Sequence, residues 1–334
     1  MKNIIITGCA GFIGFHLAKK LIQYKKINII GIDNLNNYYS QKLKKDRLKV
    51  LLKDSSSNKN FFFSNNDLKN KKDIDKIFNK YKPYVVINLA AQAGVRYSIS
   101  HPEIYLNDNI LSFLNILELS RKYNVKRVIY ASTSSVYGSN STPFSETQKT
   151  DSQIQFYAVT KKTNELMAHT WSSIYGVETI GLRFFTVYGP WGRPDMSLYY
   201  FTKNIYNGKK IDLFNYGDHI RDFTYIDDII NGINRCINFK FDRLNKKNKA
   251  VVPSLIFNLG SGRNIKLKKF IEIIEDNLGK KALVELLPMQ IGDIHSSLAD
   301  LSFSKRILGY KPNIDPVIGI KRFIKWYKAY HQLS

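Results

Sequence analysis

Cysteine and long apolar runs are both scarce in this sequence of 334 residues. Cys9 and Cys236 are too few for a disulfide framework, so a reducing compartment is expected. No apolar run approaches the roughly 18 residues that a membrane-spanning helix needs. The apolar stretch 4–6 is followed at once by Thr7 and Gly8, which leaves no hydrophobic region of a secretory signal. These absences predict a cytoplasmic protein without a membrane partner.

Acidic residues and histidines are also few. The 27 Asp and Glu stand against 51 Lys and Arg, which gives a formal net charge of +24. Such an excess can indicate nucleic-acid binding, but the lysines form only small clusters at 42–49, 69–76 and 246–249. We therefore expect a solvated lysine surface and no specific nucleic-acid partner, with attraction of an anionic substrate as the alternative. The polar runs 42–59 and 240–250 are interpreted as surface loops. The six histidines lack the spacing of metal ligands, so no metal is expected.

Apolar residues make up 44% of the chain and aromatic residues 13%, which is enough for a sizeable core and excludes a disordered chain. Through the first half, short apolar runs alternate with longer amphipathic stretches. The expected strands cover residues 2–7, 27–33, 61–64, 84–90, 125–133 and 178–185, and the expected helices cover 12–24, 70–80, 107–123 and 157–175. Buried strands separated by helices predict an α/β fold with a doubly wound, parallel, Rossmann-like sheet.

After about residue 187 this pattern loosens, beginning with a turn rich in proline and glycine at 188–196. The length of the chain, at roughly 150 residues per domain, suggests two domains. We expect a Rossmann-like domain over 1–187, to which 218–258 contributes. A smaller C-terminal α/β lobe for substrate binding would be formed by 188–217 and 259–334.

A glycine-rich turn directly follows the first expected strand and opens the first expected helix. Its glycines, Gly8, Gly11 and Gly14, have the spacing G-x-x-G-x-x-G. The first permits a tight turn, the second lets the backbone approach a pyrophosphate, and the third allows close helix packing. The N–H groups and the dipole of a helix N-terminus favour phosphates. In this strand–turn–helix context the pattern predicts a dinucleotide site, in which Phe12 and Ile13 would also take part.

The acidic residue that such a site needs ends the second expected strand. Asp33 lies about 20 residues after the last glycine and can accept hydrogen bonds from both ribose hydroxyls. Asn34 follows it, with no adjacent arginine for a 2′-phosphate, so NAD is favoured over NADP as the cofactor. Asp67 and Leu68 follow the third strand, where an adenine could be held, although Asp67 could instead cap a helix. Further cofactor contacts are expected at the end of the fourth strand, from Leu89, Ala90 and Ala91.

A tyrosine and a lysine stand four residues apart in the helix expected over 157–175. Tyr157 and Lys161 would therefore share one face of that helix. A free tyrosine has a pKa of about 10, and a nearby ammonium together with a positively charged nicotinamide would favour its phenolate. Thr133 ends the strand expected over 125–133, at the edge where doubly wound sheets bind ligands, and it can share a proton with a substrate hydroxyl. This constellation predicts catalysis by Tyr157, Lys161 and Thr133, with the first two also contacting the cofactor.

With these motifs the chain resembles the extended short-chain dehydrogenase/reductase family. Within it, the chain is similar to the NAD-dependent nucleotide-sugar epimerases, and most similar to the UDP-glucuronate 4-epimerases. The resemblance covers nearly the whole chain. Besides the family-wide glycine turn and Tyr-x-x-x-Lys pair, more selective segments are AAQAGVRYS at 90–98, YASTSSVYG at 130–138, LRFFTVYGPWGRPDM at 182–196, RDFTYIDDI at 221–229 and MQIGD at 289–293.

The resemblance implies inversion of a sugar carbon through a transient ketone. Tyr157, assisted by Thr133, would take the proton of the 4-hydroxyl. NAD would accept the hydride from C4 and return it to the opposite face of the 4-keto sugar, so that no net redox follows. Related dehydratases and decarboxylases carry an acidic residue in the segment after the catalytic threonine. Here Ser134 and Ser135 follow Thr133, which favours simple epimerisation.

The resemblance also implies a binding site for a UDP-sugar. Thr186 and Arg193 match a threonine and an arginine that lie near the sugar carboxylate in the glucuronate epimerases, whereas galactose epimerases usually have asparagine in place of the threonine. Arg221 matches an arginine that holds the pyrophosphate. Gln290 and Asp293 would face the uridine ribose or phosphate. The implied substrate residues are Thr133, Ser134, Ser135, Thr186, Arg193, Arg221, Gln290 and Asp293.

Some features depart from the family pattern or stay open. Gln153 and Gln155 replace the Pro and Ser of the common Pro-x-Ser-x-Tyr segment, and Arg96 could meet an anion that the sequence does not identify. The leading interpretation is conversion of UDP-glucuronate to UDP-galacturonate, and a 4-epimerase of UDP-N-acetylglucosamine, of its uronic acid or of UDP-glucose is the alternative. A non-catalytic NAD-binding sensor or scaffold is more remote, since such relatives usually lose the Tyr or the Lys. The resemblance further implies a homodimer through helices 107–123 and 161–175.

Overall fold

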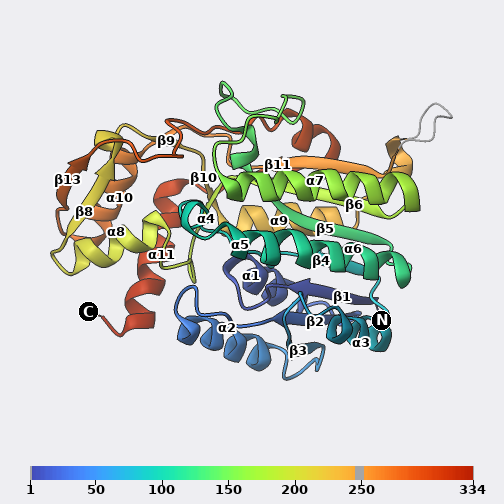
Figure 1. Ribbon diagram of the computed structural model, residues 1–334. Coiled ribbons are helices and arrows are strands. Elements are labelled where there is room, and N and C mark those ends of the chain that lie inside the picture. The colour runs from blue at the N-terminus through green and yellow to red at the C-terminus, as the bar shows by residue number, and fades with distance from the viewer. Residues whose placement is uncertain (1, 245–251, 334) are drawn as a thin grey trace.

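Seven parallel strands form the central sheet of the computed structural model, which describes residues 2–244 and 252–333 (Figure 1). In the order of the sheet, the strands are β11 (Ser254–Leu259), β6 (Glu178–Phe184), β5 (Arg127–Thr133), β4 (Val85–Asn88), β1 (Lys2–Thr7), β2 (Ile27–Asp33) and β3 (Phe61–Asn65). Every neighbouring pair is parallel, so the expected Rossmann-like sheet is confirmed. The strand order reverses between β1 and β4, and ligands bind beyond the carboxyl ends of the strands at such a reversal.

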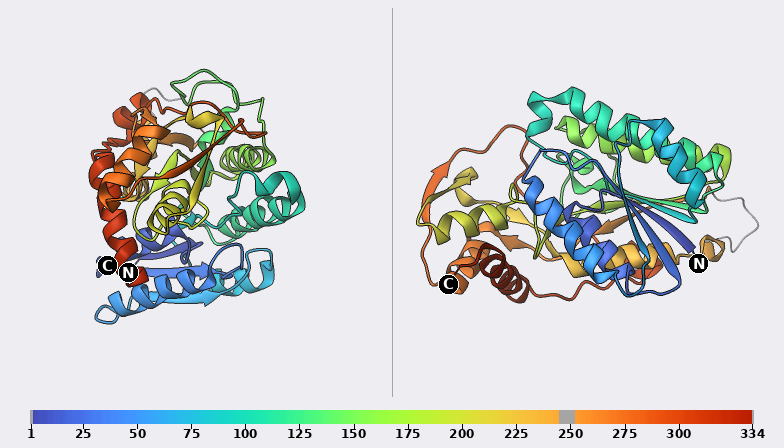
Figure 2. Two further views of the ribbon diagram at one scale, coloured as in Figure 1. Left: turned by 90° about the vertical axis from the view of Figure 1, so that its left-hand side faces the viewer. Right: turned by 90° about the horizontal axis from the view of Figure 1, so that it is seen from below.

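Successive strand residues send their side chains to opposite faces of the sheet, and each face has its own layer of helices (Figure 2). In β1, for example, Ile4 and Ile6 join one buried cluster and Ile5 joins the other. One face is covered by α3 (Lys71–Tyr81), α6 (Ser112–Lys122) and α7 (Phe156–Tyr175), and the other by α1 (Phe12–Leu21), α2 (Gln41–Asp54) and α9 (Ile226–Ile237).

Helix α2 occupies most of the run 42–59, so the interpretation of this run as a surface loop is wrong. Ser40 caps the helix because its side chain accepts a hydrogen bond from the backbone N–H of Leu43. Leu43, Leu48 and Leu51 are buried at helical spacing, while two lysines between them, Lys45 and Lys49, are exposed. Because the run is rich in charged residues, its narrow apolar face was not recognised from the sequence.

A smaller lobe lies beyond the carboxyl ends of the sheet strands, on the left of Figure 1. Its elements are α8 (Ser197–Tyr206), β8 (Lys210–Phe214), β9 (Ile220–Arg221), β12 (Ile265–Lys266), α10 (Leu267–Leu278), β13 (Leu283–Leu287) and α11 (Pro316–His331). Strand β8 pairs in parallel with β13, and β9 pairs in antiparallel with β12. Two short parallel strands, β7 (Thr186–Tyr188) and β10 (Phe223–Tyr225), pair with each other between the sheet and the lobe.

The structure bears on the expected domain boundaries, on the polar run 240–250 and on the expected absence of a membrane-spanning helix. The division into two domains at the stated boundaries stays a prediction, and α9 and β11 from 218–258 lie in the layers of the sheet. Of the polar run 240–250, Phe241–Leu244 form a short helical turn after Lys240, and residues 245–250 lie outside the described residues. Within residues 2–244 and 252–333, no helix combines the length and the apolar character needed to cross a membrane.

A buried ion pair fixes helix α7 against the sheet. Glu165 of α7 accepts hydrogen bonds from Arg183 of β6, with Nε–Oε1 and Nη2–Oε2 distances of 2.9 and 2.8 Å. The two side chains are only 2% and 3% exposed. Ser132 of β5 donates to Glu165 Oε1 at 2.6 Å. Because α7 carries Tyr157 and Lys161, this pair helps to set their position relative to β5.

Replacing Glu165→Gln should lower the free energy of unfolding by about 3 kcal/mol, since Arg183 would be left buried without its carboxylate. Urea unfolding followed by circular dichroism measures the loss. Glu118→Gln is the matched control, because Glu118 of α6 pairs with Arg121 in a partly exposed ion pair whose removal costs at most about 1 kcal/mol. Equal losses in the two variants would contradict the role given to the buried pair.

Candidate active site

The turn between β1 and α1 has room only for glycine at two of its positions. Gly8 has a φ of +69°, and a Cβ there would lie 2.8 Å from the backbone nitrogen of Ala90. A Cβ on Gly14 would lie 2.1 Å from the carbonyl oxygen of Gly8. Helix α1 begins after Gly11, which provides no side-chain cap, so the first N–H groups of the helix stay available to a ligand. The turn therefore fits the pyrophosphate of a dinucleotide.

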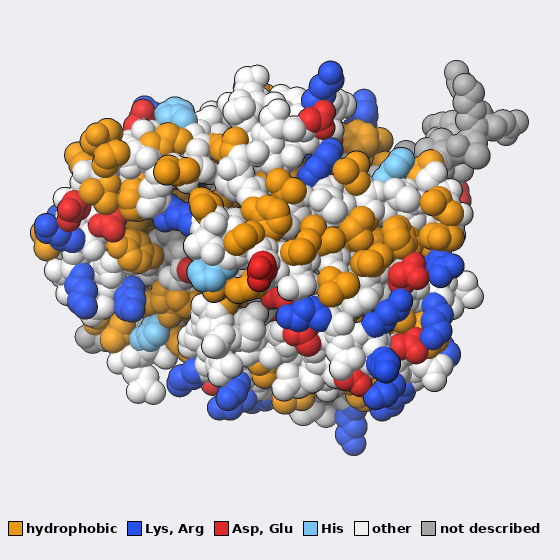
Figure 3. All heavy atoms as spheres, in the orientation of Figure 1, with side chains coloured by type: hydrophobic (Ala, Val, Ile, Leu, Met, Phe, Trp, Pro, Cys, Tyr) orange, Lys and Arg blue, Asp and Glu red, His pale blue; other side chains and the backbone are white. Residues whose placement is uncertain are grey.

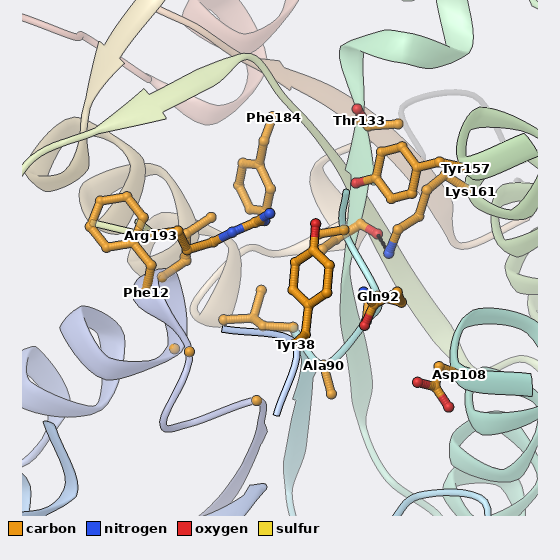
Figure 4. A pocket seen from close by; sticks show the side chains of 18 of the residues that line it. Phe12, Tyr38, Ala90, Gln92, Asp108, Thr133, Tyr157, Lys161, Phe184 and Arg193 are labelled. Carbon is orange, nitrogen blue, oxygen red and sulfur yellow. Dashed lines mark hydrogen bonds between the residues drawn. The ribbon is translucent and has the colours of Figure 1, made fainter. Parts of the chain in front are cut away.

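One pocket runs along the carboxyl ends of β1, β2, β4 and β5, at the reversal of the strand order (Figure 4). Its lining includes all the residues predicted to contact NAD and five of those predicted to contact the substrate: Gly8, Gly11, Phe12, Ile13, Gly14, Asp33, Asn34, Asp67, Leu68, Leu89, Ala90, Ala91, Tyr157 and Lys161 for NAD, and Thr133, Ser134, Ser135, Thr186 and Arg193 for the substrate. The fold thus brings these residues together, and their individual roles stay predictions.

The carboxylate of Asp33, at the end of β2, is held in a fixed orientation. Its two oxygens accept hydrogen bonds from the backbone N–H groups of Ala10 (3.0 Å) and Leu35 (2.9 Å). A carboxylate has about four acceptor positions, so capacity remains for the two ribose hydroxyls. Asp67 accepts a hydrogen bond from Asn34 Nδ2 at 3.1 Å, and helix α3 has a different capping residue. This end of the pocket fits the adenosine half of NAD.

Sequence analysis missed several residues that line the same pocket, namely Asn36, Tyr38, Lys44, Asn66, Gln92, Asp108, Phe184 and Met196. Lys44 was missed because it belongs to the run 42–59 that was interpreted as a loop. Its Nζ donates to the carbonyl and side-chain oxygens of Asn36 at 2.8 and 2.6 Å, and burial lowers the pKa of Lys44 to about 8. The helical spacing of Leu43, Leu48 and Leu51 was the available signal that part of this run faces inward.

Tyr157 and Lys161 lie one turn apart on α7, and both side chains face the pocket (Figure 4). Lys161 Nζ lies 6.0 Å from the centre of the Tyr157 ring and donates to the carbonyl of Ala131 at 2.9 Å. Burial lowers the pKa of Lys161 to about 8. Burial also raises the pKa of Tyr157, which the charge of Arg193 and a hydrogen bond with Thr133 only partly offset. A positively charged nicotinamide beside the ring would favour the phenolate.

Arg193 points its guanidinium into the pocket and is already paired with a carboxylate (Figure 4). Its Nε donates to Asp195 Oδ1 at 3.0 Å, and its Nη2 donates to Asp195 Oδ2. Tyr38 also donates to Asp195 Oδ2, at 3.4 Å. Burial works against the charge of Arg193, but the neighbouring Asp195 outweighs it and raises the pKa of the guanidinium. The arginine is thus oriented by a side chain two residues further along the chain.

The other three predicted substrate residues form a second group, on the lobe and outside the lining of this pocket. Arg221 Nη2 donates to Asp293 Oδ1 at 2.9 Å, and Arg221 Nη1 donates to the carbonyl of His295 at 2.8 Å. His219 Nε2 lies 3.4 Å from Asp293 Oδ2. Gln290 has a buried side-chain oxygen without a hydrogen-bond partner. The expected substrate residues are therefore divided between the pocket and the lobe.

The structure gives contacts for the three residues that the sequence left open, Gln155, Gln153 and Arg96. Gln155, directly before α7, donates to the carbonyl of Gly292, so it ties the start of the catalytic helix to the loop that carries Gln290 and Asp293. Gln153 donates to the carbonyl of Val136 at 3.2 Å. The guanidinium of Arg96 lies 5.0 Å from the centre of the Phe214 ring, on the lobe.

Helix α1 contacts the turn 188–196 through a histidine. His16 donates from Nε2 to the carbonyl of Pro190 at 2.8 Å and packs between the rings of Phe12 and Phe15. Burial lowers the pKa of His16 to about 4. The turn that carries Arg193 is thus attached to the first helix of the sheet domain by a neutral imidazole.

The neutral form of His16 should make stability depend on pH. The unfolded chain binds a proton here below about pH 6.5, whereas the folded chain does so only near pH 4, so stability present above pH 6.5 is lost as the pH falls. Between pH 7 and 5 the free energy of unfolding of the unmodified protein, measured with urea, should fall by about 2 kcal/mol more than that of His16→Gln. His169→Gln, at an exposed position of α7, should follow the unmodified protein. If the free energy of unfolding changed with pH in the same way in all three proteins, His16 would not be the origin of the pH dependence.

Comparisons with known proteins agree with this geometry. The sequence model of the NAD dependent epimerase/dehydratase family matches residues 4–260. Protein CapI of Staphylococcus aureus is 47% identical over 99% of both chains. A protein of Rhizobium meliloti named probable UDP-glucuronate 4-epimerase is 40% identical, over 97% of this chain and 96% of its own.

A solved structure extends the agreement to the whole fold. The crystal structure of UDP-glucuronic acid 4-epimerase from Bacillus cereus, in complex with UDP-glucuronic acid and NAD, matches with a TM-score of 0.88 at 30% identity. The match covers 98% of this chain and 99% of that one. From the family match over residues 4–260 and these relatives, the chain belongs to the NAD dependent epimerase/dehydratase family of extended short-chain dehydrogenases/reductases.

Proposed function

We propose that this protein is a UDP-glucuronate 4-epimerase, which uses NAD to invert C4 of the sugar and gives UDP-galacturonate. The observation that carries the proposal is that Tyr157, Lys161 and Thr133 share one pocket with the glycine turn and Arg193. The names of the R. meliloti and B. cereus relatives support the same reaction, and the B. cereus structure holds UDP-glucuronic acid and NAD.

The residues around the sugar would hold and move one proton. When bound on the glycine turn, NAD supplies an acceptor for the hydride at C4 and a donor for its return. Tyr157 exchanges the proton of the 4-hydroxyl, and Thr133 hydrogen-bonds the same oxygen. The Thr133 hydroxyl is itself oriented by the N–H of Ser135, which donates to it at 3.2 Å. Lys161, fixed on the carbonyl of Ala131, keeps an ammonium near the Tyr157 ring and so favours the phenolate.

The position of the carboxylates favours epimerisation over dehydration or decarboxylation. Among the described residues, the acidic residues that line the pocket are Asp33, Asp67 and Asp108. Asp33 and Asp67 follow β2 and β3, which are separated from β5 by β4 and β1. Asp108 lies apart from Tyr157 in Figure 4 and pairs with Lys69 at 2.7 Å. Elimination would need a further acid or base beside the sugar. The three carboxylates that line the pocket lie away from Tyr157, and Asp195 is already engaged by Arg193 and Tyr38.

Two groups of residues would divide the recognition of the substrate. Arg193 and Thr186, with the hydroxyls of Ser134 and Ser135, would hold the uronate carboxylate in the pocket. Arg221, Gln290 and Asp293, on the lobe, would hold the uridine diphosphate. The alternative is a 4-epimerase of UDP-N-acetylglucosamine, of its uronic acid or of UDP-glucose.

We also infer that two copies pair through α6 and α7. Apolar side chains gather over these helices in Figure 3, and they include Leu166 and Ile174, which are 58% and 65% exposed. Such a patch is typical of a protein–protein contact, and two helices from each copy would form a four-helix bundle across a two-fold axis. The cytoplasmic location stays a prediction.

The purified protein, incubated with UDP-glucuronate and no added NAD, should produce the H4 signal of galacturonate in proton NMR. Tyr157→Phe should slow the conversion by at least about 100-fold while retaining NAD, because the proton transfer to and from the sugar is lost. Lys162→Met is the control, since Lys162 donates to Thr150 and should leave the rate within about twofold. No conversion with or without added NAD would contradict the glucuronate assignment, and conversion of UDP-glucose or UDP-N-acetylglucosamine alone would favour the alternative.

Arg193→Gln should lower the affinity for UDP-glucuronate by about tenfold or more, and the affinity for UDP-glucose much less, because only the uronate offers a carboxylate. Isothermal titration of the NAD-loaded protein with each nucleotide measures the two affinities. Arg263→Gln, which removes a partly exposed arginine 3.5 Å from Asp315, should change neither. Equal losses for both nucleotides in Arg193→Gln would place the carboxylate elsewhere.

A further inference from the structure

Arg47 of helix α2 is an arginine in the interior with no carboxylate beside it. Its relative exposure is 0%, and among the described residues no Asp or Glu lies within ion-pair distance of it. A guanidinium keeps its charge in proteins, so its burial is costly unless polar atoms surround it. Arg47 also has no place in the chemistry described above. Its position therefore calls for a different explanation.

The guanidinium reaches two loops that are far apart in the sequence. Nη1 donates to the carbonyl of Ala10 and to the hydroxyl of Tyr39, both at 2.8 Å. Nη2 donates to the carbonyl of Trp191 at 2.5 Å and lies 3.5 Å from that of Gly192. Ala10 belongs to the glycine turn, whereas Trp191 and Gly192 directly precede Arg193. One side chain thus joins the backbone of the cofactor turn to the backbone that carries Arg193.

The turn at 188–196 needs such a contact to keep its shape. Trp191 has a φ of +61°, a left-handed conformation that is costly for a residue other than glycine. Its ring packs against Phe15, Trp326 and Tyr330 at centroid distances of 5.3, 5.4 and 5.2 Å. These contacts fix the ring of Trp191, and the hydrogen bond from Arg47 fixes its carbonyl group. Because Arg193 follows two residues later, its position depends on both contacts.

We propose that Arg47 is a positioning residue for the uronate site, which sets where Arg193 stands relative to the dinucleotide on the glycine turn. The proposal rests on the proposed function. The planar guanidinium can serve both loops at once, because its two Nη groups point in different directions. A lysine at this position would keep the charge but would reach only one of the two loops. The distance between Arg193 and the cofactor would then no longer be fixed by a single rigid group.

The test compares Arg47→Lys and Arg47→Met with the unmodified NAD-loaded protein, by titration with UDP-glucuronate and with UDP-glucose. We expect the preference for UDP-glucuronate, taken as the ratio of the two dissociation constants, to fall about tenfold in Arg47→Lys and at least as far in Arg47→Met. A merely structural role would lower the melting temperature and leave this ratio unchanged. If Arg47→Met does not fold, Arg47→Lys decides alone.

The control is Lys45→Met, which removes one positive charge from the exposed face of the same helix and should preserve the ratio. Arg193→Gln gives the ratio to be expected when the carboxylate contact is lost completely. A ratio retained in both Arg47 variants would overturn the positioning role. Failure of the unmodified protein to prefer or convert UDP-glucuronate would instead overturn the proposed function, so the two failures are distinguishable.

Discussion

The pocket depends on how closely the start of helix α1 approaches the end of strand β1. A Cβ on Gly14 would lie only 2.1 Å from the carbonyl oxygen of Gly8, so the two segments can be this close only because Gly14 has no side chain. This close packing turns the backbone sharply and leaves Ala10 at the apex, where its N–H reaches Asp33 and its carbonyl reaches Arg47. Thr7, directly before the turn, accepts hydrogen bonds from the N–H groups that follow β4. This short turn therefore sets the relative positions of five elements, β1, β2, β4, α1 and α2.

Sequence reasoning succeeded where a single element carries the whole signal. The apolar strands have continuous patterns, and Tyr157 and Lys161 lie one turn apart on one helix, so local spacing was enough to predict their shared face. It failed for α2, because lysines between the leucines made an amphipathic helix look like a charged loop, and Lys44 and Arg47 were lost with it. Arg221 of β9 contacts Asp293 of the loop after β13, although the two residues are far apart in the sequence. No local sequence pattern predicts such a contact.

Arg183 and Arg47 are buried, Arg193 is partly exposed, and the three are compensated in two different ways. Arg183 faces Glu165, and Arg193 faces Asp195, so each joins one side chain to another. Arg47 instead faces carbonyl groups and a hydroxyl, and it therefore holds main chain. Because a carbonyl belongs to the main chain, a hydrogen bond to it fixes the path of a loop directly and not through a flexible side chain. Arg47 therefore shapes the loops around the pocket, whereas Arg183 fixes helix α7 through Glu165.

The pair of Arg193 and Asp195 has a consequence for how a charged sugar is recognised. Asp195 compensates the positive charge of the guanidinium, which weakens its attraction for small free anions. Under the proposed function, a uronate would share this guanidinium with Asp195, which accepts hydrogen bonds from Nε and Nη2. A neutral sugar would offer the guanidinium no second carboxylate. The gain from the second contact would be modest, because the positive charge is already compensated, and release of the product would stay easy.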